Sequence, residues 1–409
     1  MLLDYDLPLP RHSFGVGRVL LLSLHADPTT TVGAPENGGV TVYVRELARA
    51  LAEEGWPVDV VTRRRDPDAP EREDRNGVNV IRIDAGPPKP LRNDDIAKYL
   101  NHAYDAVRAL AAARTYRFVS SHYWLSGVVG DRIAREFSIP HVHTLHSHGV
   151  ERKKRDDVTL ERIEAERALL QRAKIATLSK EHVNIFRQKY GVDAQFNVVP
   201  AGVDTSRFRP GDRGAALSEL GLGPERPWFG YVGRLAKEKG IDDLLGAFAL
   251  LHARRPDAGL FVVGGASERS RIPELKQLAQ RLHISEAVRF LGPIPNDRVP
   301  TAFQGADVLL VPSHYEAFGL VALEARATGV PVIASDVGGL RELVSAQTGG
   351  VRVPPKDYIA WAQEMERVLQ PHVLRQRRAL ALREMRGDVY SWRTVANTIA
   401  GIACAQTHV

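Results

Sequence analysis

Cysteine is almost missing from this chain, because its 409 residues include a single one, Cys404. This excludes a disulfide framework, a thiolate metal cluster and a redox pair. Long apolar runs are missing as well, and the longest early run, at residues 19–24, is far too short to cross a bilayer. The segment before it lacks the basic start and the small-residue cleavage site of a signal peptide. We therefore expect a cytoplasmic protein that is not stably inserted in a membrane.

A strong excess of either charge is also missing. Basic and acidic residues number 55 and 49, so the formal net charge is only +6. This mild, dispersed positive charge favours phosphorylated small ligands and predicts no nucleic-acid partner. Neither half of the chain opens with a G-x-G-x-x-G turn after its first strand, which disfavours a nicotinamide-dependent oxidoreductase.

The chain is too long for one hydrophobic core, so its length predicts two domains. Short apolar runs typical of buried strands alternate with stretches of helical spacing, an order that indicates parallel sheets covered by helices on both faces. The strand-like runs lie at residues 19–24, 58–62, 78–83, 118–121, 141–145, 175–178, 198–199, 229–232, 260–263, 288–291, 308–311 and 332–334. We predict an α/β protein with two doubly wound, Rossmann-like domains facing a cleft.

The domain boundary is expected at residues 200–210, PAGVDTSRFRP, which are rich in turn formers and have no clear periodicity. We assign residues 1–204 to the first domain and 205–409 to the second. The sequence does not determine which domain the helical stretch at 358–398 packs on, and its last helices could pack back on the first domain. Ligands of open α/β sheets bind outside the carboxyl ends of the strands.

Residues 312–324, PSHYEAFGLVALE, place two carboxylates eight positions apart around the start of a predicted helix. Glu316 lies in the turn after an apolar strand, and Glu324 lies inside the helix. Carboxylates accept hydrogen bonds from sugar hydroxyls, so the pair suits a sugar nucleotide. The alternative is a surface helix with two solvated glutamates.

The amides of Phe318, Gly319 and Leu320 are expected at the N-terminus of that helix. Because such amides lack partners within the helix and are reinforced by its dipole, they favour an anion such as a pyrophosphate.

A basic loop at residues 233–240, GRLAKEKG, follows the first strand of the second half. Arg234 and Lys239 are placed to reach a diphosphate, the first as a fork and the second as a point charge. The alternative is an ordinary strand-to-helix loop with exposed basic residues.

Two further segments follow strands of the first half. Residues 37–39 precede a long predicted helix, and glycines there permit close approach of an anion to the helix end. The run HVHTLHSH at residues 141–148 lacks a nearby cysteine or paired carboxylate that would complete a metal site, so we predict no metal. His146 is expected instead to face a ligand from the end of its strand, and a buried structural histidine remains the alternative.

Together these segments resemble the retaining GT-B glycosyltransferases of family 4, over nearly the whole chain. GRLAKEKG is similar to the basic loop of that family, and EAFGLVALE is similar to its E-x7-E element. SHYWLSG at 121–127 and NGGVTVYVRELARAL at 37–51 most resemble the branch with the mycothiol enzyme that glycosylates inositol phosphate. RIEAE at 162–166 resembles sucrose-phosphate synthases of the same branch.

The resemblance implies a nucleotide-sugar donor, most simply a UDP sugar, and a role for each matching residue on the donor side. Arg234 and Lys239 would neutralise the departing diphosphate, Glu316 would hold sugar hydroxyls and Glu324 the ribose. The remaining donor contacts would come from Gly39, Gly233, Ile294, Phe318, Gly319, Leu320 and His146. No cofactor and no divalent metal is implied, because basic side chains and a helix dipole replace the metal.

The implied acceptor is a small polar molecule, such as a sugar phosphate, an inositol phosphate or an aminocyclitol. Tyr123, Ser147 and Arg162 match three residues that hold the acceptor phosphate in the family, with serine replacing threonine. The position aligned with the family's lysine reads Arg92. Either Arg92 or Lys89 substitutes for that lysine, or the acceptor carries no phosphate.

Two other functions stay open from the sequence. UDP-N-acetylglucosamine 2-epimerases share the GT-B architecture and use acidic residues for proton transfer, but they have no need of SHYWLSG. A non-catalytic nucleotide-sugar-binding protein is the other. The sequence leaves a homodimer open.

Overall fold

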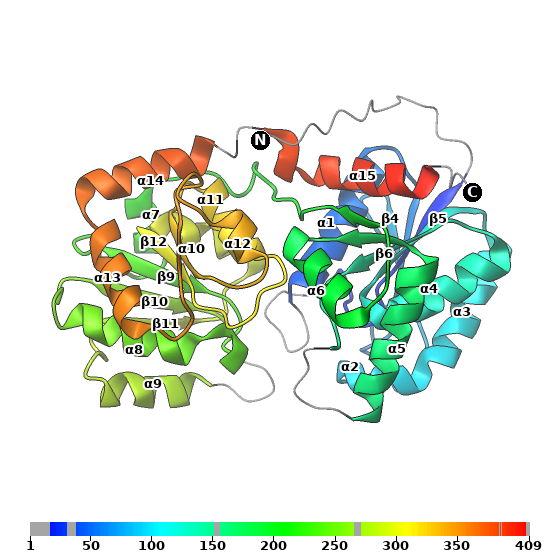
Figure 1. Ribbon diagram of the computed structural model, residues 1–409, viewed down its shortest axis with the longest axis horizontal. Helices are drawn as coiled ribbons and strands as arrows, with labels where there is room; N and C mark the ends of the chain where they lie inside the picture. The colour runs from blue at the N-terminus through cyan, green and yellow to red at the C-terminus, as the bar shows by residue number, and fades with distance from the viewer. Residues whose placement is uncertain are drawn as a thin grey trace.

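The computed structural model describes residues 17–30, 38–150, 156–265, 271–383, 385 and 387–405. These residues form two bodies that lie side by side, each built on a sheet with helices on both faces (Figure 1). The prediction of an α/β protein with two doubly wound domains is confirmed. Among the described residues, no helix is both long enough and apolar enough to span a membrane.

The N-terminal sheet is parallel except at one edge. Its described strands are β1 (Arg18–Leu22), β2 (Val58–Arg63), β3 (Arg72–Arg75), β4 (Val78–Ile83), β5 (Tyr116–His122), β6 (His141–Leu145), β7 (Lys174–Thr177) and β8 (Phe196–Val198). They are ordered β3-β4-β2-β1-β5-β6-β7-β8, and only β3 runs antiparallel to its neighbour. Because the order reverses beside β1, the carboxyl ends of β1 and β5 form a topological switch point.

The C-terminal sheet is parallel throughout its described strands. These are β9 (Trp228–Val232), β10 (Gly259–Val263), β11 (Val288–Gly292), β12 (Val308–Val311), β13 (Val332–Ser335) and β14 (Val351–Val353). Their order is β11-β10-β9-β12-β13-β14, so the switch point lies between β9 and β12. The basic loop follows β9 and the turn with Glu316 follows β12, so the topology brings these two segments together.

Helices connect successive strands in both domains. The first domain has α1 (Gly39–Glu53), α2 (Asn93–Ile96), η1 (Ala97–Tyr99), α3 (Leu100–Ala113), α4 (Tyr123–Phe137), α5 (Asp157–Arg172) and α6 (Lys180–Tyr190). The rest of the chain has α7 (Arg213–Glu219), η2 (Lys237–Lys239), α8 (Ile241–His252), α9 (Ile272–Arg281), η3 (Asn296–Arg298), α10 (Val299–Gly305), α11 (Leu320–Ala327), α12 (Leu340–Leu343), α13 (Tyr358–Val368), α14 (Pro371–Arg383), η4 (Asp388–Tyr390) and α15 (Trp392–Cys404).

Strand β1 shows why the strands read as continuous apolar runs. Val19 and Leu21 pack in one apolar cluster with Leu47 of α1, whereas Leu20 packs in another with Leu125 of α4. All five side chains are fully buried. Both faces of the sheet are therefore covered, and each such side chain stabilises the fold by about 1.5–3 kcal/mol.

The last helix, α15, lies across the N-terminal domain although the segment before it belongs to the C-terminal one (Figure 1). Its Trp392 meets the ring of Tyr43 edge-on, with centroids 5.2 Å apart. Lys174 donates to the carbonyls of Ile402 and Ala403 at 3.0 and 3.1 Å. The end of α15 is thereby fixed to β7.

The chain crosses between the domains at two neighbouring places. In the linker, the amide of Val203 donates to the carbonyl of Tyr390 at 2.8 Å. A Cβ added to Gly202 would lie 2.7 Å from the backbone nitrogen of Trp392, so a glycine is needed for this close approach. Adjacent crossings of this kind allow two domains to move as bodies about one axis.

Candidate active site

The start of α1 faces the C-terminal domain. A Cβ added to Gly38 would lie 4.0 Å from Nε of Arg234, and one added to Gly39 would lie 3.4 Å from Cδ1 of Leu320. Gly38 caps α1 without any side-chain hydrogen bond among the described residues. Amides at this helix start are therefore close to both the basic loop and the start of α11. Asn37, which belongs to the same predicted segment, lies outside the described residues.

The basic loop is shaped by glycine. A Cβ added to Gly264 would lie 1.8 Å from the carbonyl oxygen of Gly233, so the loops after β9 and β10 touch through their backbones. The hydroxyl of Tyr231, in β9, donates to the carbonyl of Arg234 in the loop at 2.7 Å. The guanidinium of Arg234 is 3.2 Å from Glu238, in a pair exposed enough to exchange partners.

Lys239 and Glu316 form the central ion pair of the site, with Nζ and Oε2 2.6 Å apart. Ser313 also donates to Oε2 of Glu316 at 3.3 Å. The amide of Gly339 donates to the carbonyl of Glu316 at 2.9 Å, and Gly338 adopts a φ of +45° where a Cβ would strike that same oxygen. Glu316 is therefore held through both its side-chain carboxylate and its backbone carbonyl.

Helix α11 begins at Leu320, two residues later than the sequence predicted. Gly319 is its N-cap with a φ of +102°, a conformation that favours glycine, and no side chain among the described residues caps the helix. Phe318 and Gly319 therefore precede the helix, while their amides remain beside its first turn.

Glu324 lies one turn inside α11 and is only partly exposed. Burial of its carboxyl raises the pKa to about 8; the charges of Arg207 and Arg45 oppose this shift and that of Glu46 adds to it. Arg45 and Glu46 belong to α1, so Glu324 faces the first domain. A carboxyl that is neutral near pH 7 can donate as well as accept a hydrogen bond.

Ile294 lies in the loop after β11, partly buried against the apolar cluster that joins both domains. Arg207 of the linker donates to the backbone carbonyl of Asn296 in the same loop. The linker therefore holds the loop that carries Ile294, one of the residues expected to contact the donor.

His146 is buried at the end of β6. Its Nε2 is 3.0 Å from Nδ1 of His122, and its ring meets that of Tyr43 edge-on with centroids 4.9 Å apart. Burial, followed by the charges of neighbouring histidines, lowers its pKa well below the usual range, so the ring is neutral. Among the described residues, no group of three or more His, Cys, Asp or Glu side chains could hold a metal ion.

Three residues predicted to bind the acceptor come together around one guanidinium. Arg162 donates to the hydroxyls of Ser147 at 2.9 Å and Tyr123 at 3.2 Å, and its Nε donates to Glu166 at 2.7 Å. Tyr190 also donates to Glu166. Burial is the largest single influence on the pKa of Arg162 and lowers it, but the charge and hydrogen bond of Glu166 together with Tyr123 and Tyr190 make the net shift upward. We call Tyr123, Ser147, Arg162 and Glu166 the acceptor cluster.

Arg92 is not part of this cluster in the structure. It is exposed at the N-cap of α2, and no hydrogen bond among the described residues joins it to the other three. Lys89, the other predicted substitute, is exposed as well. Another arginine, Arg65, influences this region electrostatically: burial first, then the charges of Arg65 and Arg162, lower the pKa of His25 to about 3.

Arg65 is half-buried after β2, and the ring of His25 lies 4.5 Å from that of Tyr123. No motif in the sequence pointed to Arg65. The only available signal was its position after a predicted strand.

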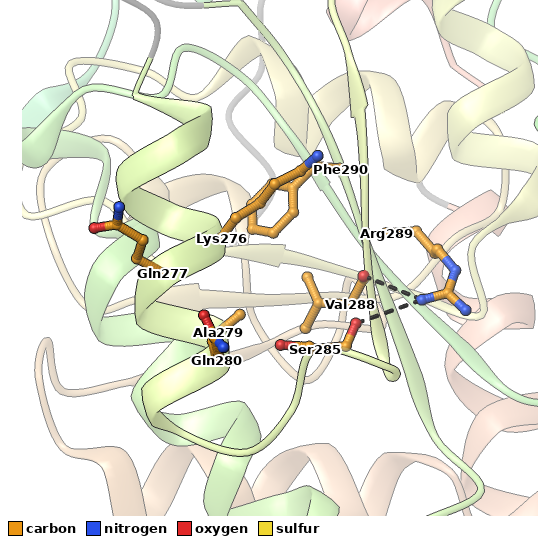
Figure 2. A pocket seen from close by; sticks show the side chains of 8 residues that line it. All are labelled: Lys276, Gln277, Ala279, Gln280, Ser285, Val288, Arg289 and Phe290. Carbon is orange, nitrogen blue, oxygen red and sulfur yellow. Dashed lines mark hydrogen bonds between the residues drawn. The ribbon is translucent and has the colours of Figure 1, made fainter.

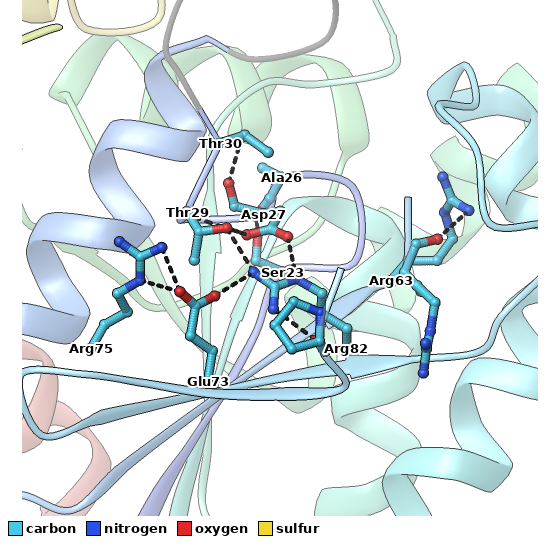
Figure 3. A network of polar contacts seen from close by, with 11 residues as sticks. Ser23, Ala26, Asp27, Thr29, Thr30, Arg63, Glu73, Arg75 and Arg82 are labelled. Atoms are coloured by element: carbon cyan, nitrogen blue, oxygen red, sulfur yellow. Dashed lines mark hydrogen bonds and ion pairs between the residues drawn. The ribbon is translucent and has the colours of Figure 1, made fainter. Parts of the chain in front are cut away.

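A polar network holds the segment that leads from β1 toward α1 (Figure 3). Arg82 of β4 donates to Asp27 at 3.0 Å, to Thr29 at 2.8 Å and to Glu73 at 2.9 Å. The guanidinium is almost fully buried, so its charge is compensated by the two carboxylates. This network fixes residues 27–29 against β4.

A cavity of about 460 Å³ lies elsewhere, between α9 and β11 at the outer edge of the C-terminal sheet (Figure 2). Lys276, Arg289 and Phe290 are among its lining residues. None of the residues predicted for the site lines it, so we do not place the site there.

The fold, with two doubly wound domains whose strand ends face each other, is that of a GT-B glycosyltransferase. Comparison with known proteins agrees. A family model described as "Glycosyl transferase 4-like domain" matches residues 38–202, and "Glycosyl transferases group 1" matches residues 212–384. The chain belongs to the group 1 glycosyltransferases, within family 4, and it is a transferase enzyme. The resemblance stated from the sequence is confirmed.

Two curated proteins show the similarity over most of the chain. The D-inositol 3-phosphate glycosyltransferase of Segniliparus rotundus is 37% identical over 360 residues, which cover 85% of this chain and 79% of that protein. The one from Nocardia farcinica is 36% identical over 368 residues, covering 86% and 81%.

Two solved structures illustrate the range of structural similarity. Sucrose-phosphate synthase from Thermosynechococcus elongatus superimposes with a TM-score of 0.87 at 33% identity, covering 94% of this chain and 98% of that one. Anabaena HepE in complex with UDP-glucose gives a TM-score of 0.73 at 20% identity, covering 94% and 98%, and shows the fold alone.

Proposed function

We propose that this enzyme is a retaining glycosyltransferase that moves a hexose or an N-acetylhexosamine from a UDP sugar to a hydroxyl of a small polar acceptor. An inositol phosphate or another sugar phosphate is the first choice of acceptor, and an aminocyclitol is the next. The observation that carries the proposal is the Lys239–Glu316 pair beside the start of α11, opposite the glycine start of α1.

Two helix starts and two cations favour a diphosphate between the domains. The first-turn amides of α1 and α11 attract negative charge. Lys239 has three donor hydrogens, so it can keep Glu316 and still reach a phosphate oxygen. Arg234 and Lys239 together stabilise the negative charge of the departing diphosphate.

The donor sugar and nucleoside are oriented by groups around these cations. Glu316 accepts hydrogen bonds from sugar hydroxyls and Glu324 binds the ribose. The backbone of Ile294 pairs with the base, and His146 contacts the sugar from the first domain.

The reaction breaks the bond between the anomeric carbon and the diphosphate oxygen, and it forms a bond from that carbon to the acceptor oxygen on the same face. The acceptor proton passes to a phosphate oxygen, so no protein nucleophile is assigned. Independence from a metal and a cytoplasmic location stay predictions.

The acceptor cluster supports an anionic acceptor. Arg162 is aimed by Glu166 at Ser147 and Tyr123, and the curated relatives are named for an inositol phosphate. We propose Arg65 as the second cation for the acceptor phosphate, because its charge acts on His25 next to Tyr123.

The test is transfer from isotope-labelled UDP-glucose and UDP-N-acetylglucosamine to a panel of inositol phosphates, sugar phosphates and aminocyclitols, followed by mass spectrometry with and without EDTA. We expect one labelled product, unchanged by EDTA and lost in Glu316→Ala. The matched control is Glu286→Ala, at an exposed position after α9. Absence of turnover with every nucleotide sugar would refute the proposal.

A further inference from the structure

One phenol joins the two domains next to the candidate active site. The hydroxyl of Tyr315, in the turn after β12, is 3.0 Å from Nε2 of His182 and 3.3 Å from Nε2 of His148. Tyr315 belongs to the C-terminal domain, whereas both histidines belong to the N-terminal one. The contact is therefore made only when the two domains lie together.

The surroundings of the phenol form an ordered aromatic site. His182 is fully buried and His148 is 5% exposed. The rings of Tyr315 and His148 meet edge-on with centroids 5.5 Å apart, and both histidines also pack edge-on against Phe186. The imidazoles are thus held in place to receive one hydroxyl.

The contact lies next to the residues assigned to the sugar donor, because Tyr315 directly precedes Glu316. The next residue, Ala317, accepts a hydrogen bond from Ser179 at the N-cap of α6 at 3.4 Å. A second contact lies nearby, where Arg341 is 2.8 Å from Glu181. The turn that carries Glu316 is therefore docked on the start of α6.

The acceptor side is equally close in sequence. His148 follows Ser147, whose hydroxyl accepts from Arg162. The amide of Gly149 donates to Glu166 at 2.9 Å. His148 therefore lies between Ser147, a member of the acceptor cluster, and Gly149, which is bound to another member, Glu166.

We propose that Tyr315 is a positioning residue whose hydroxyl, bridging His148 and His182, sets the orientation of Glu316 relative to the acceptor cluster when the domains close. The inference rests on the proposed function, because it concerns the encounter of the two substrates. Tyr315 touches neither reacting atom and acts through its neighbour.

The hydrogen-bond chemistry supports this role. A phenol can donate one hydrogen bond and accept another, so it can bond to two neutral imidazoles of suitable tautomers at once. Burial, then the charge of Arg162, lowers the pKa of His148 to about 4, and burial, then His148, lowers that of His182 to about 3. Both rings are therefore neutral at physiological pH.

The experiment compares Tyr315→Phe with wild type in the full chain. We expect kcat for transfer to fall about tenfold, as loss of a buried hydrogen bond predicts, while the Kd of UDP stays within about twofold. Hydrogen exchange at residues 179–183 and 314–318 should quicken. The matched control is Tyr104→Phe, which removes the exposed hydroxyl on α3 that is bonded to Glu136.

A second pair of variants separates positioning from simple stability. His182→Gln retains an amide that can meet the phenol and should recover part of the activity lost in His182→Ala. The effects of Tyr315→Phe and His182→Ala on kcat should be less than additive in the double variant, because both remove one contact.

Three outcomes would overturn the inference: an unchanged kcat in Tyr315→Phe, additive effects in the double variant, or a loss of UDP affinity as large as the loss of kcat. If wild type transfers no sugar from any donor, the proposed function fails and the inference falls with it. If wild type is active and Tyr315→Phe equals it, only the inference fails.

Discussion

The two sheet edges that face each other between the domains differ in how far their charged side chains are exposed to solvent. On the C-terminal edge, the charges are partly exposed: Lys239 and Glu316 keep 23% and 19% of their side-chain surface, and Arg234 keeps 41%. On the N-terminal edge, Arg162 and Glu166 keep only 5% and 1%. The charged side chains of the C-terminal edge can exchange their ion-pair partners, whereas the buried pair of the N-terminal edge cannot.

Under the proposed function, this difference implies that the two substrates are bound in different ways. Exposed cations would be free to rearrange around a diphosphate that arrives with its own charge and then leaves. A buried ion pair is costly to rearrange, so it gives a fixed shape and charge to the acceptor cluster. Four predictions test this contrast, from the largest expected effect to the smallest.

The first concerns the buried pair. Arg162→Met should lower the free energy of unfolding by about 3–5 kcal/mol, because Glu166 is left as an uncompensated buried charge. Denaturant unfolding measures this, with Arg167→Met on the exposed face of α5 as the matched control. The double variant Arg162→Met, Glu166→Leu should regain much of the loss. A cost below about 1 kcal/mol for Arg162→Met would remove the contrast between the edges.

The second concerns the exposed edge. Lys239→Ala should lower kcat for transfer by about 100- to 1000-fold, as loss of one group that stabilises developing charge does, with little change in stability. Lys237→Ala, in the same loop but exposed, is the control and should stay near wild type. Equal effects of the two substitutions would mean that the loop supplies only general positive charge.

The third uses the carboxyl of Glu324, whose pKa is raised to about 8 mainly by burial. Between its ordinary pKa, near 4.5, and 8, the folded state binds more protons than the unfolded state, so stability falls as pH rises through this window. Glu324→Gln should therefore be more stable than wild type at pH 9 and equal to it at pH 4. We expect a difference of about 1–3 kcal/mol, below the roughly 5 kcal/mol that the full shift implies, because Glu324 is partly exposed and solvent screens its charge. Thermal unfolding across that range measures this. A pH-independent difference would show that the carboxyl is not desolvated.

The fourth compares two arginines. Arg65→Ala should raise the KM for a phosphorylated acceptor by about tenfold, because one charge-assisted hydrogen bond is lost. Arg92→Ala, at the exposed N-cap of α2, should leave this KM unchanged. The reverse result would restore the role that sequence reasoning gave to Arg92. Initial rates at saturating donor provide the measurement.

Much of the fold followed from local patterns. Each predicted strand overlaps an observed one. Strands buried on both faces tend to be continuously apolar, as residues 19–22 of β1 and all of β12 are. The edge strand β3, REDR, has no such pattern, since all four residues are partly or fully exposed, and it was not predicted. The short strand β14 was missed for the same reason, because Val351 and Arg352 are not buried.

The site was readable where its residues lie close together in sequence. The basic loop and the turn with Glu316 each follow a strand of the same sheet, so topology alone brings Lys239 to Glu316. Contacts between elements far apart in sequence were not readable. Nothing local places the charge of Arg65 near His25, or joins Tyr315 to His182.

The sequence by itself determined two doubly wound domains and the loops that carry the candidate cations and glutamates, because period, turn residues and strand ends are local properties. Only the tertiary structure decided which charges are buried and which histidines meet the phenol of Tyr315. It also decided that α15 packs on the first domain. The physical reason is that desolvation and hydrogen bonding across domains depend on distances between segments, which no local spacing of residues specifies.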